Sequence, residues 1–377
     1  MERISKYQVG TMIILFEIGS TPLFELGIKA QRDAWLAVLF AILFGLALVL
    51  LFLAIQSREP ELNLTQMLTR YWGPFVGKLT AVLYTLLFVY EAMRNVRDFG
   101  DLTVMTFLSR SPISLIMGVL LFLSVFAIYK GIDNLFRVSE FMVIGVLFFY
   151  LLLAVMIFIS GIVHFEQLLP MFENGVLPVV TLAATNTVFF PFGQMVLFLM
   201  FWSCLKPKQG MIGATFGAYL VSSTVILLSN IMNLAVLGVH YTSISTVPLL
   251  QNIQLIQIAR VLERFDAFVV MLFYAGIFIR ATLWYLGAVI AMGDIFNTDY
   301  RKLILPVGFV IYAAAFLEPD WPYHIFLGHF VAYTLMVNPL FYAILPMLLY
   351  VVMLMRRNLN HNSMEDGEGK INRTSDS

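Results

Sequence analysis

The stretch FEIGSTPLF, residues 16–24, interrupts the first long apolar run of the chain with a carboxylate, a glycine, two hydroxyls and a proline. Gly19 and Pro22 each weaken a continuous helix, the proline because it removes a backbone donor and clashes with a carbonyl one turn earlier. Ser20 and Thr21 can bond the backbone groups that a break leaves free. The pattern fits a plain proline kink, and it also fits a helix that breaks to expose its backbone to a ligand.

The composition is that of a membrane protein with many spans. Of 377 residues, 60% are hydrophobic and 12% are charged, and the mean hydropathy is +0.87, which is more apolar surface than a soluble core of this size can bury. A single cysteine, Cys204, excludes an internal disulfide and a cysteine cluster for a metal. A formal net charge of zero gives no reason to expect nucleic acid. No catalytic motif is present, so we expect no enzyme, no metal and no cofactor.

Ten apolar stretches are long enough to cross the roughly 30 Å hydrocarbon core of a bilayer. They lie at about residues 8–30, 33–55, 78–108, 112–129, 139–162, 179–203, 210–239, 262–293, 302–317 and 327–355. We therefore expect an all-α integral membrane domain of ten transmembrane helices over residues 1–357. The polar segment at 358–377 predicts a disordered tail.

Lys and Arg are unevenly distributed between the two sets of connectors. One set, which includes both termini, holds most of them, whereas the other holds only Lys29, Arg32, Arg110, Arg260 and Arg264. Cytoplasmic loops carry such an excess. Both termini are therefore expected in the cytoplasm, as an even number of spans also requires.

A second interruption falls in the sixth span, where FFPFGQ at 189–194 places Pro191 and Gly193 inside an apolar run. The first and sixth spans correspond to each other if the chain is a 5+5 inverted repeat, with halves at about 8–162 and 179–355. Carriers built from such repeats bind their substrate at the midplane, between two discontinuous helices. The positive ends of the half-helices there favour an anionic group. The sequence thus predicts a ligand site between the breaks.

The third span carries five charged residues, although each costs at least about 2.5 kcal/mol at the bilayer centre. At about 100° per residue, Glu91, Arg94, Asp98 and Asp101 share one face, and Arg97 lies at its margin. The spacing allows pairs of Glu91 with Arg94, of Arg94 with Asp98 and of Arg97 with Asp101. The stripe is either a self-neutralised structural network or a polar pathway through the protein.

Two more charges lie inside predicted spans without a partner in their own helix. Glu17 precedes the first break, and Arg280 lies in the eighth span. Each needs a partner from another helix, and a Glu17–Arg280 pair is one possibility. None of the histidines suggests catalysis, and those before the tail fall at or near the predicted outer face: His164, His240, His324 and His329.

Several motifs together indicate a family. They are ISKYQ at 4–8 ahead of the broken first span, RNVRDFGDLTVMTFL at 94–108 with the turn SRSP, KGIDNLFRVSE at 130–140, FENGVLPV at 172–179 and FPFGQ at 190–194. With these motifs the chain resembles, over most of residues 4–357, the B-subunits of bacterial endospore germinant receptors. These spore germination proteins are part of the amino acid/polyamine/organocation transporter superfamily.

The resemblance implies a transporter-like fold in the spore inner membrane. Such a subunit senses a small nutrient, typically an amino acid, and signals germination together with an A-subunit and a C-subunit lipoprotein. The ligand-contacting breaks of the superfamily map onto Gly19, Ser20 and Thr21 and onto Phe190, Pro191, Phe192 and Gly193.

We add Glu17 and Arg280 to these ligand-binding candidates, and we take the five charges of the third span as the candidate polar pathway. Two other functions remain open. One is an amino acid permease, with proton coupling through Glu17 or Glu91 as an option. The other is a conduit for ions or water along the third span.

Overall fold

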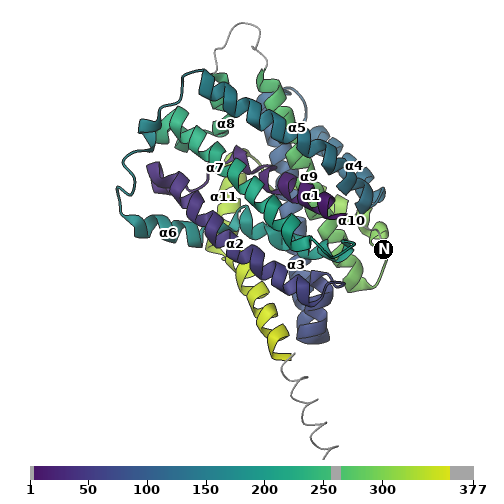
Figure 1. Ribbon diagram of the computed structural model, residues 1–377. Coiled ribbons are helices and arrows are strands. Elements are labelled where there is room, and N and C mark those ends of the chain that lie inside the picture. The colour runs from purple at the N-terminus through teal and green to yellow at the C-terminus, as the bar shows by residue number, and fades with distance from the viewer. Residues whose placement is uncertain (1–3, 256–264, 357–377) are drawn as a thin grey trace, which may run out of the picture.

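The computed structural model describes residues 4–255 and 265–356 and shows a single helical bundle (Figure 1). Over these two ranges every regular element is helical, and one isolated bridge pairs Ile4 with Leu205. The predicted all-α class is therefore confirmed. The tail predicted at 358–377 lies outside the described residues.

The α-helices vary widely in length. In chain order they are α1 (Lys6–Ile18), α2 (Ala34–Arg58), α3 (Leu64–Thr106), α4 (Ile113–Tyr129), α5 (Ile132–Ile159), α6 (Val176–Thr185), α7 (Met211–Ile244), α8 (Pro248–Gln254), α9 (Phe265–Phe296), α10 (Ile304–Ala314), α11 (Trp321–His329) and α12 (Val337–Pro339). Short 3₁₀ and π turns join or extend several of them.

Within the described ranges, eight helical segments are long and apolar enough to cross a membrane: Ile28–Arg58, Leu64–Thr106, Ile132–Ile159, Val176–Met200, Met211–Ile244, Phe273–Phe296, Tyr300–Leu317 and Val337–Arg356. They coincide with eight of the ten predicted spans. The predicted first span contains α1, which has 13 residues, and the fourth is α4, which has 17. The chain is therefore a multi-pass membrane protein, and the count of ten crossings stays a prediction.

The surface of the bundle carries many exposed apolar side chains, and several charged side chains are buried inside it. Phe141 and Phe309 are more than two thirds exposed, whereas Glu17 and Arg280 are completely buried. A soluble protein has the opposite arrangement, because its charges remain in water. This surface suits lipid, and it requires the internal charges to find partners among the helices.

The first predicted break is present at the centre of the bundle. α1 packs against α5, α7 and α9 (Figure 1), and it begins at a capping box in which Ser5 and Gln8 bond each other's backbone N–H. It ends at Ile18, and a 3₁₀ turn over Thr21–Leu23 follows.

The second predicted break is present as well. α6 ends at Thr185, and a 3₁₀ turn covers Thr187–Phe189. After Pro191, helical structure begins again as a 3₁₀ segment over Phe192–Met200. Proline removes an internal hydrogen bond from a helix, so the α-helix cannot continue through this position.

The connector before the third span is more helical than its polarity predicts. Asn63 and Gln66 form a capping box, so α3 begins at Leu64, well ahead of the predicted start at residue 78. The helix then bends at Gly73, whose φ of 82° is a left-handed conformation that glycine adopts without strain, and Pro74 follows it.

α1 and α9 meet backbone to backbone where the first break begins. A Cβ added to Gly276 would lie 2.5 Å from Cα and 2.7 Å from the carbonyl oxygen of Gly19. Neither backbone can yield to a side chain at this distance. The end of α1 is thereby fixed against α9, the helix that carries Arg280.

Gly276→Ala is therefore expected to destabilise the protein by about 1–3 kcal/mol, the usual cost of overpacking. The measurement is the unfolding temperature of the purified protein in detergent. Gly145→Ala is the matched control, because no heavy atom of the described chain lies within 4 Å of its added Cβ. Equal unfolding temperatures for the two variants would contradict the close contact.

Candidate functional site

A cavity of about 280 Å³ lies between the two breaks. Ser20 and Phe24 line it from the first break, Phe190 and Gln194 line it from the second, and Arg280 lines it from α9. Both interruptions therefore border the same internal space. α3 contributes a further polar wall, made of Tyr90, Glu91, Arg94, Asn95 and Asp98.

Arg280 links the two breaks. Its Nη1 donates to the carbonyl of Phe16 at 3.1 Å and to Oγ1 of Thr21 at 3.2 Å, and its Nη2 donates to Oε1 of Gln194. The guanidinium carbon lies 5.0 Å from the ring centre of Phe16 and 4.9 Å from that of Phe190, within cation–π range. Its Nε finds no hydrogen-bond partner in the described chain, so the guanidinium still has donor capacity for a ligand.

Gln194 extends this network to α3. Its Nε2 donates to Oε2 of Glu91 at 3.1 Å, and the hydroxyl of Tyr342 donates to Oε1 of the same carboxylate at 2.8 Å. The sequence prediction missed both residues. The amide that directly follows the Pro-Phe-Gly interruption was a usable signal for Gln194, whereas Tyr342 carries none.

Glu17 is buried behind the first break. It is not part of the cavity wall, and neither carboxylate oxygen has a hydrogen-bond partner among the residues that the structure describes. The hydrogen-bonded Glu17–Arg280 pair considered from the sequence is absent over those same residues. Nη1 of Arg280 is bonded instead by the Phe16 carbonyl and the Thr21 hydroxyl.

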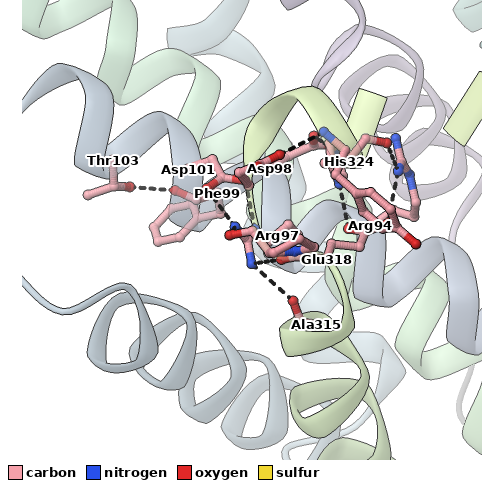
Figure 2. Close-up of polar contacts among 12 residues, drawn as sticks. Arg94, Arg97, Asp98, Phe99, Asp101, Thr103, Ala315, Glu318 and His324 are labelled. Atoms are coloured by element: carbon pink, nitrogen blue, oxygen red, sulfur yellow. Dashed lines mark hydrogen bonds and ion pairs between the residues drawn. The ribbon is translucent and has the colours of Figure 1, made fainter. Parts of the chain in front are cut away.

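The charges of α3 point toward the connector that follows α10 (Figure 2). Arg97 pairs with Asp101 at 2.7 Å, as predicted. Arg97 also donates to three backbone carbonyls at the end of the α10 region, those of Ala315, Glu318 and Pro319. Terminal carbonyls of a helix lack intrahelical partners, so this arginine completes the end of that segment.

The predicted pairs of Arg94 with Glu91 and with Asp98 are wrong for the described structure. Arg94 pairs with Glu318 at 3.1 Å and donates to the carbonyl of His324. Asp98 lies 2.7 Å from Nε2 of His324, whose Nδ1 lies 2.5 Å from Glu318 (Figure 2). Glu318 is completely buried, and a buried carboxylate needs a cation as partner. Arg94 of α3 is that cation.

His324 is completely buried, although the sequence suggested no role for it. Its two ring nitrogens face carboxylates of Asp98 and Glu318, and only a protonated imidazole donates from both nitrogens. His324 lies between the segments Tyr300–Leu317 and Val337–Arg356. Burial lowers its pKa, but the two carboxylates outweigh this effect and raise the pKa above its ordinary value.

The predicted site residues divide into two groups. Of the ligand-binding candidates, Ser20, Phe190 and Arg280 are on the cavity wall, as are three of the pathway candidates, Glu91, Arg94 and Asp98. The others are packed away from the cavity: Glu17, Gly19, Thr21, Pro191, Phe192, Gly193, Arg97 and Asp101.

Gln194→Leu is expected to destabilise the protein by about 2–4 kcal/mol, because Arg280 and Glu91 each lose a buried partner. Thermal unfolding in detergent measures this loss. Gln251→Leu, at an exposed position of α8, is the control and should leave the unfolding temperature near that of the parent. A Gln194→Leu protein with parental stability would show that the bridge does not hold these charges.

The chain matches known proteins over most of its length. A family model described as "Spore germination protein" matches residues 3–321. Spore germination protein KB of Bacillus subtilis (strain 168) is 31% identical over 366 residues, which cover 96% of this chain and 97% of that protein. Spore germination protein YndE of the same organism is 20% identical, over 85% of this chain and 86% of that one.

Two solved structures share the fold. MhsT in complex with L-phenylalanine aligns with a TM-score of 0.63 and 13% identity, over 83% of this chain and 79% of MhsT. Mhp1 is a nucleobase-cation-symport-1 family transporter, solved in a closed conformation with bromovinylhydantoin bound. It aligns with a TM-score of 0.56 and 13% identity, over 86% of this chain and 75% of its own. At this identity the likeness shows a transporter fold and nothing more.

Proposed function

The chain belongs to the spore germination protein family, and from this premise we propose that it is a nutrient-sensing subunit of a germinant receptor. It is a multi-pass membrane protein with a transporter-like fold, and it is not an enzyme. In the proposed function a small molecule binds between the broken helices. The bundle then changes state and signals to partner subunits, which requires that the ligand bind one state better than the other.

The charge pattern of the cavity wall carries this proposal. Arg94 and Arg280 supply positive charge and Glu91 and Asp98 supply negative charge around a space of about 280 Å³. Such a volume is at the small end of ligand pockets. Both signs within one small cavity suit a small zwitterion.

Polar atoms without partners support the same proposal. Besides Arg280, three wall residues each have a buried atom that lacks a hydrogen-bond partner within the described ranges: Oγ of Ser20, the hydroxyl of Tyr90 and Oδ1 of Asn95. Buried polar groups are nearly always bonded. A polar ligand in the cavity would supply the missing bonds.

The proposed ligand is an amino acid. Its carboxylate would lie against Arg280, which has a donor left over, and its ammonium group against Glu91. The L-phenylalanine in the MhsT complex is an amino acid bound by a protein of the same fold, which favours this class of ligand.

The family resemblance supplies the rest of the proposal. We place the protein in the spore inner membrane with both termini in the cytoplasm, together with an A-subunit and a C-subunit lipoprotein. The two five-helix repeats, at about 8–162 and 179–355, would each contribute one broken helix to the site.

An amino acid permease is the second candidate, and the likeness to two transporter structures favours it. Proteoliposomes and a panel of labelled amino acids separate the two functions. Saturable uptake with counterflow would make the protein a permease, whereas binding without uptake supports a receptor. Neither binding nor uptake, with the A- and C-subunits also reconstituted, would overturn the proposal.

Arg280→Gln is expected to weaken binding of the amino acid by about 30-fold or more, since loss of one partner of a buried charge pair costs about 2–5 kcal/mol. Equilibrium binding to the purified protein measures the change, and its elution in size-exclusion chromatography reports folding. Arg137→Gln, in an exposed pair with Asp133, should bind like the parent. Unchanged affinity in folded Arg280→Gln would remove this arginine from the site.

Gly193→Leu should abolish the germination response while the protein still inserts into the membrane. A Cβ at Gly193 would already lie 3.0 Å from Cβ of Tyr342, so the larger side chain displaces Tyr342 from Glu91. Gly213→Leu is the control, because its added Cβ meets no heavy atom of the described residues within 4 Å. The measurement is the germination rate of spores that carry each variant. Normal germination of Gly193→Leu spores would show that the second break is not needed for the response.

A further inference from the structure

One side of the cavity is covered by a single segment of the chain. Ile325, Gly328 and His329 of α11 line the cavity, and so do Ala332 and Tyr333 of the π-helical turn that follows. The wall on this side is therefore formed by residues 325–333. Displacing this segment would open the cavity.

The backbone around this segment is irregular. The π-helical turn covers Phe330–Thr334, and such turns are frequent at functional sites. Met336, just after the turn, has a φ of 56°, a left-handed conformation that is uncommon for a residue with a side chain and costs of order 1–3 kcal/mol. A second conformation of the segment would relieve this strain, so residues 330–336 have the properties of a hinge.

Side chains from two other elements hold the segment in place. On α3, Arg94 binds Glu318 and the His324 carbonyl, and Asp98 binds the His324 ring. From the 3₁₀ turn Ile28–Asp33, Nζ of Lys29 lies 2.9 Å from Nε2 of His329. The Lys29 contact is exposed to solvent, whereas the contacts at His324 are buried.

The contacts at His324 depend on the charge of its ring. The ring is faced by Asp98 and Arg94 from α3 and by Glu318 from its own connector, and it stacks on Trp321 with 5.4 Å between ring centres. A protonated ring donates to both carboxylates. A neutral ring has one N–H, so one buried carboxylate then loses its donor.

We propose that residues 318–336 form the gate of the cavity, and that His324, held between Asp98 and Glu318, is the latch that keeps it closed. The latch also senses the ligand, a part of the inference that rests on the proposed function. Arg94 and Asp98 belong both to the latch and to the cavity wall. A charged ligand group that binds Arg94 competes with Glu318, and one that binds Asp98 competes with His324. Ligand binding therefore changes the stability of the closed gate.

The test measures access to the deep end of the cavity, and it needs no ligand. Cys204→Ser removes the natural thiol, and Ser20→Cys places a reporter at a wall position that is 1% exposed. The probe is a fluorescein maleimide added to the purified protein in detergent. Glu318→Gln and His324→Gln should each accelerate labelling by at least about tenfold, because opening then breaks fewer charge-assisted hydrogen bonds.

Arg32→Gln is the matched control. It removes two exposed contacts of Arg32, one of 3.9 Å with Glu173 and one of 3.0 Å with the Leu169 carbonyl. Exposed pairs contribute little, so labelling should stay within about twofold of the parent rate. Acceleration by Arg32→Gln equal to that by the latch variants would overturn the proposal. So would parental labelling rates in both Glu318→Gln and His324→Gln.

A pH series tests the latch without altering it. The raised pKa of His324 means that the latch is fully formed at low pH and is lost as the pH rises through that pKa. As the pH rises above about 6.5, the ordinary pKa of histidine, the labelling of Ser20→Cys should rise relative to that of the exposed reference Ser57→Cys. The ratio should stay flat in His324→Gln, and a flat ratio in both proteins would overturn the proposal even if the variants fold poorly.

Discussion

A charge that is buried in a membrane must find its partners inside the protein, and this constraint accounts for the position of the first break. Arg280 is bonded by the carbonyl of Phe16, the hydroxyl of Thr21 and the amide of Gln194. In an unbroken helix the Phe16 carbonyl would bond the N–H of Ser20. The interruption releases that oxygen, so the break and the buried arginine stabilise each other.

The same constraint shapes the charged face of α3. When His324 is protonated, Arg94, Arg97 and His324 balance Asp98, Asp101 and Glu318, and the network as a whole is neutral. Removing one member leaves another charge buried without its partner, which costs more than an ordinary hydrogen bond. A network of this kind favours one closed arrangement, and it opens only when several contacts are exchanged together.

Local features were predictable from the sequence, and long-range partners were not. Gly19, Pro22 and Pro191 disfavour a helix wherever they stand, and the Arg97–Asp101 pair follows from helix geometry alone. The partner of Arg94 lies more than two hundred positions away, in a connector whose polar sequence indicates only a loop. Arg94 pairs with Glu318 instead of with its neighbours on α3 because of the way the helices pack in three dimensions. Sequence periodicity contains no information about this packing.

A receptor and a carrier of this fold differ in what happens at the opposite end of the bundle. There Asp294 of α9 accepts hydrogen bonds from Asn63, Thr65 and Gln66 at the start of α3. Separation of α9 from the start of α3 would break these three bonds, whereas the gate proposed at His324 does not involve them. A ligand that loosens the latch and leaves Asp294 bonded would change the shape of the protein on one face alone, which is the behaviour expected of a receptor.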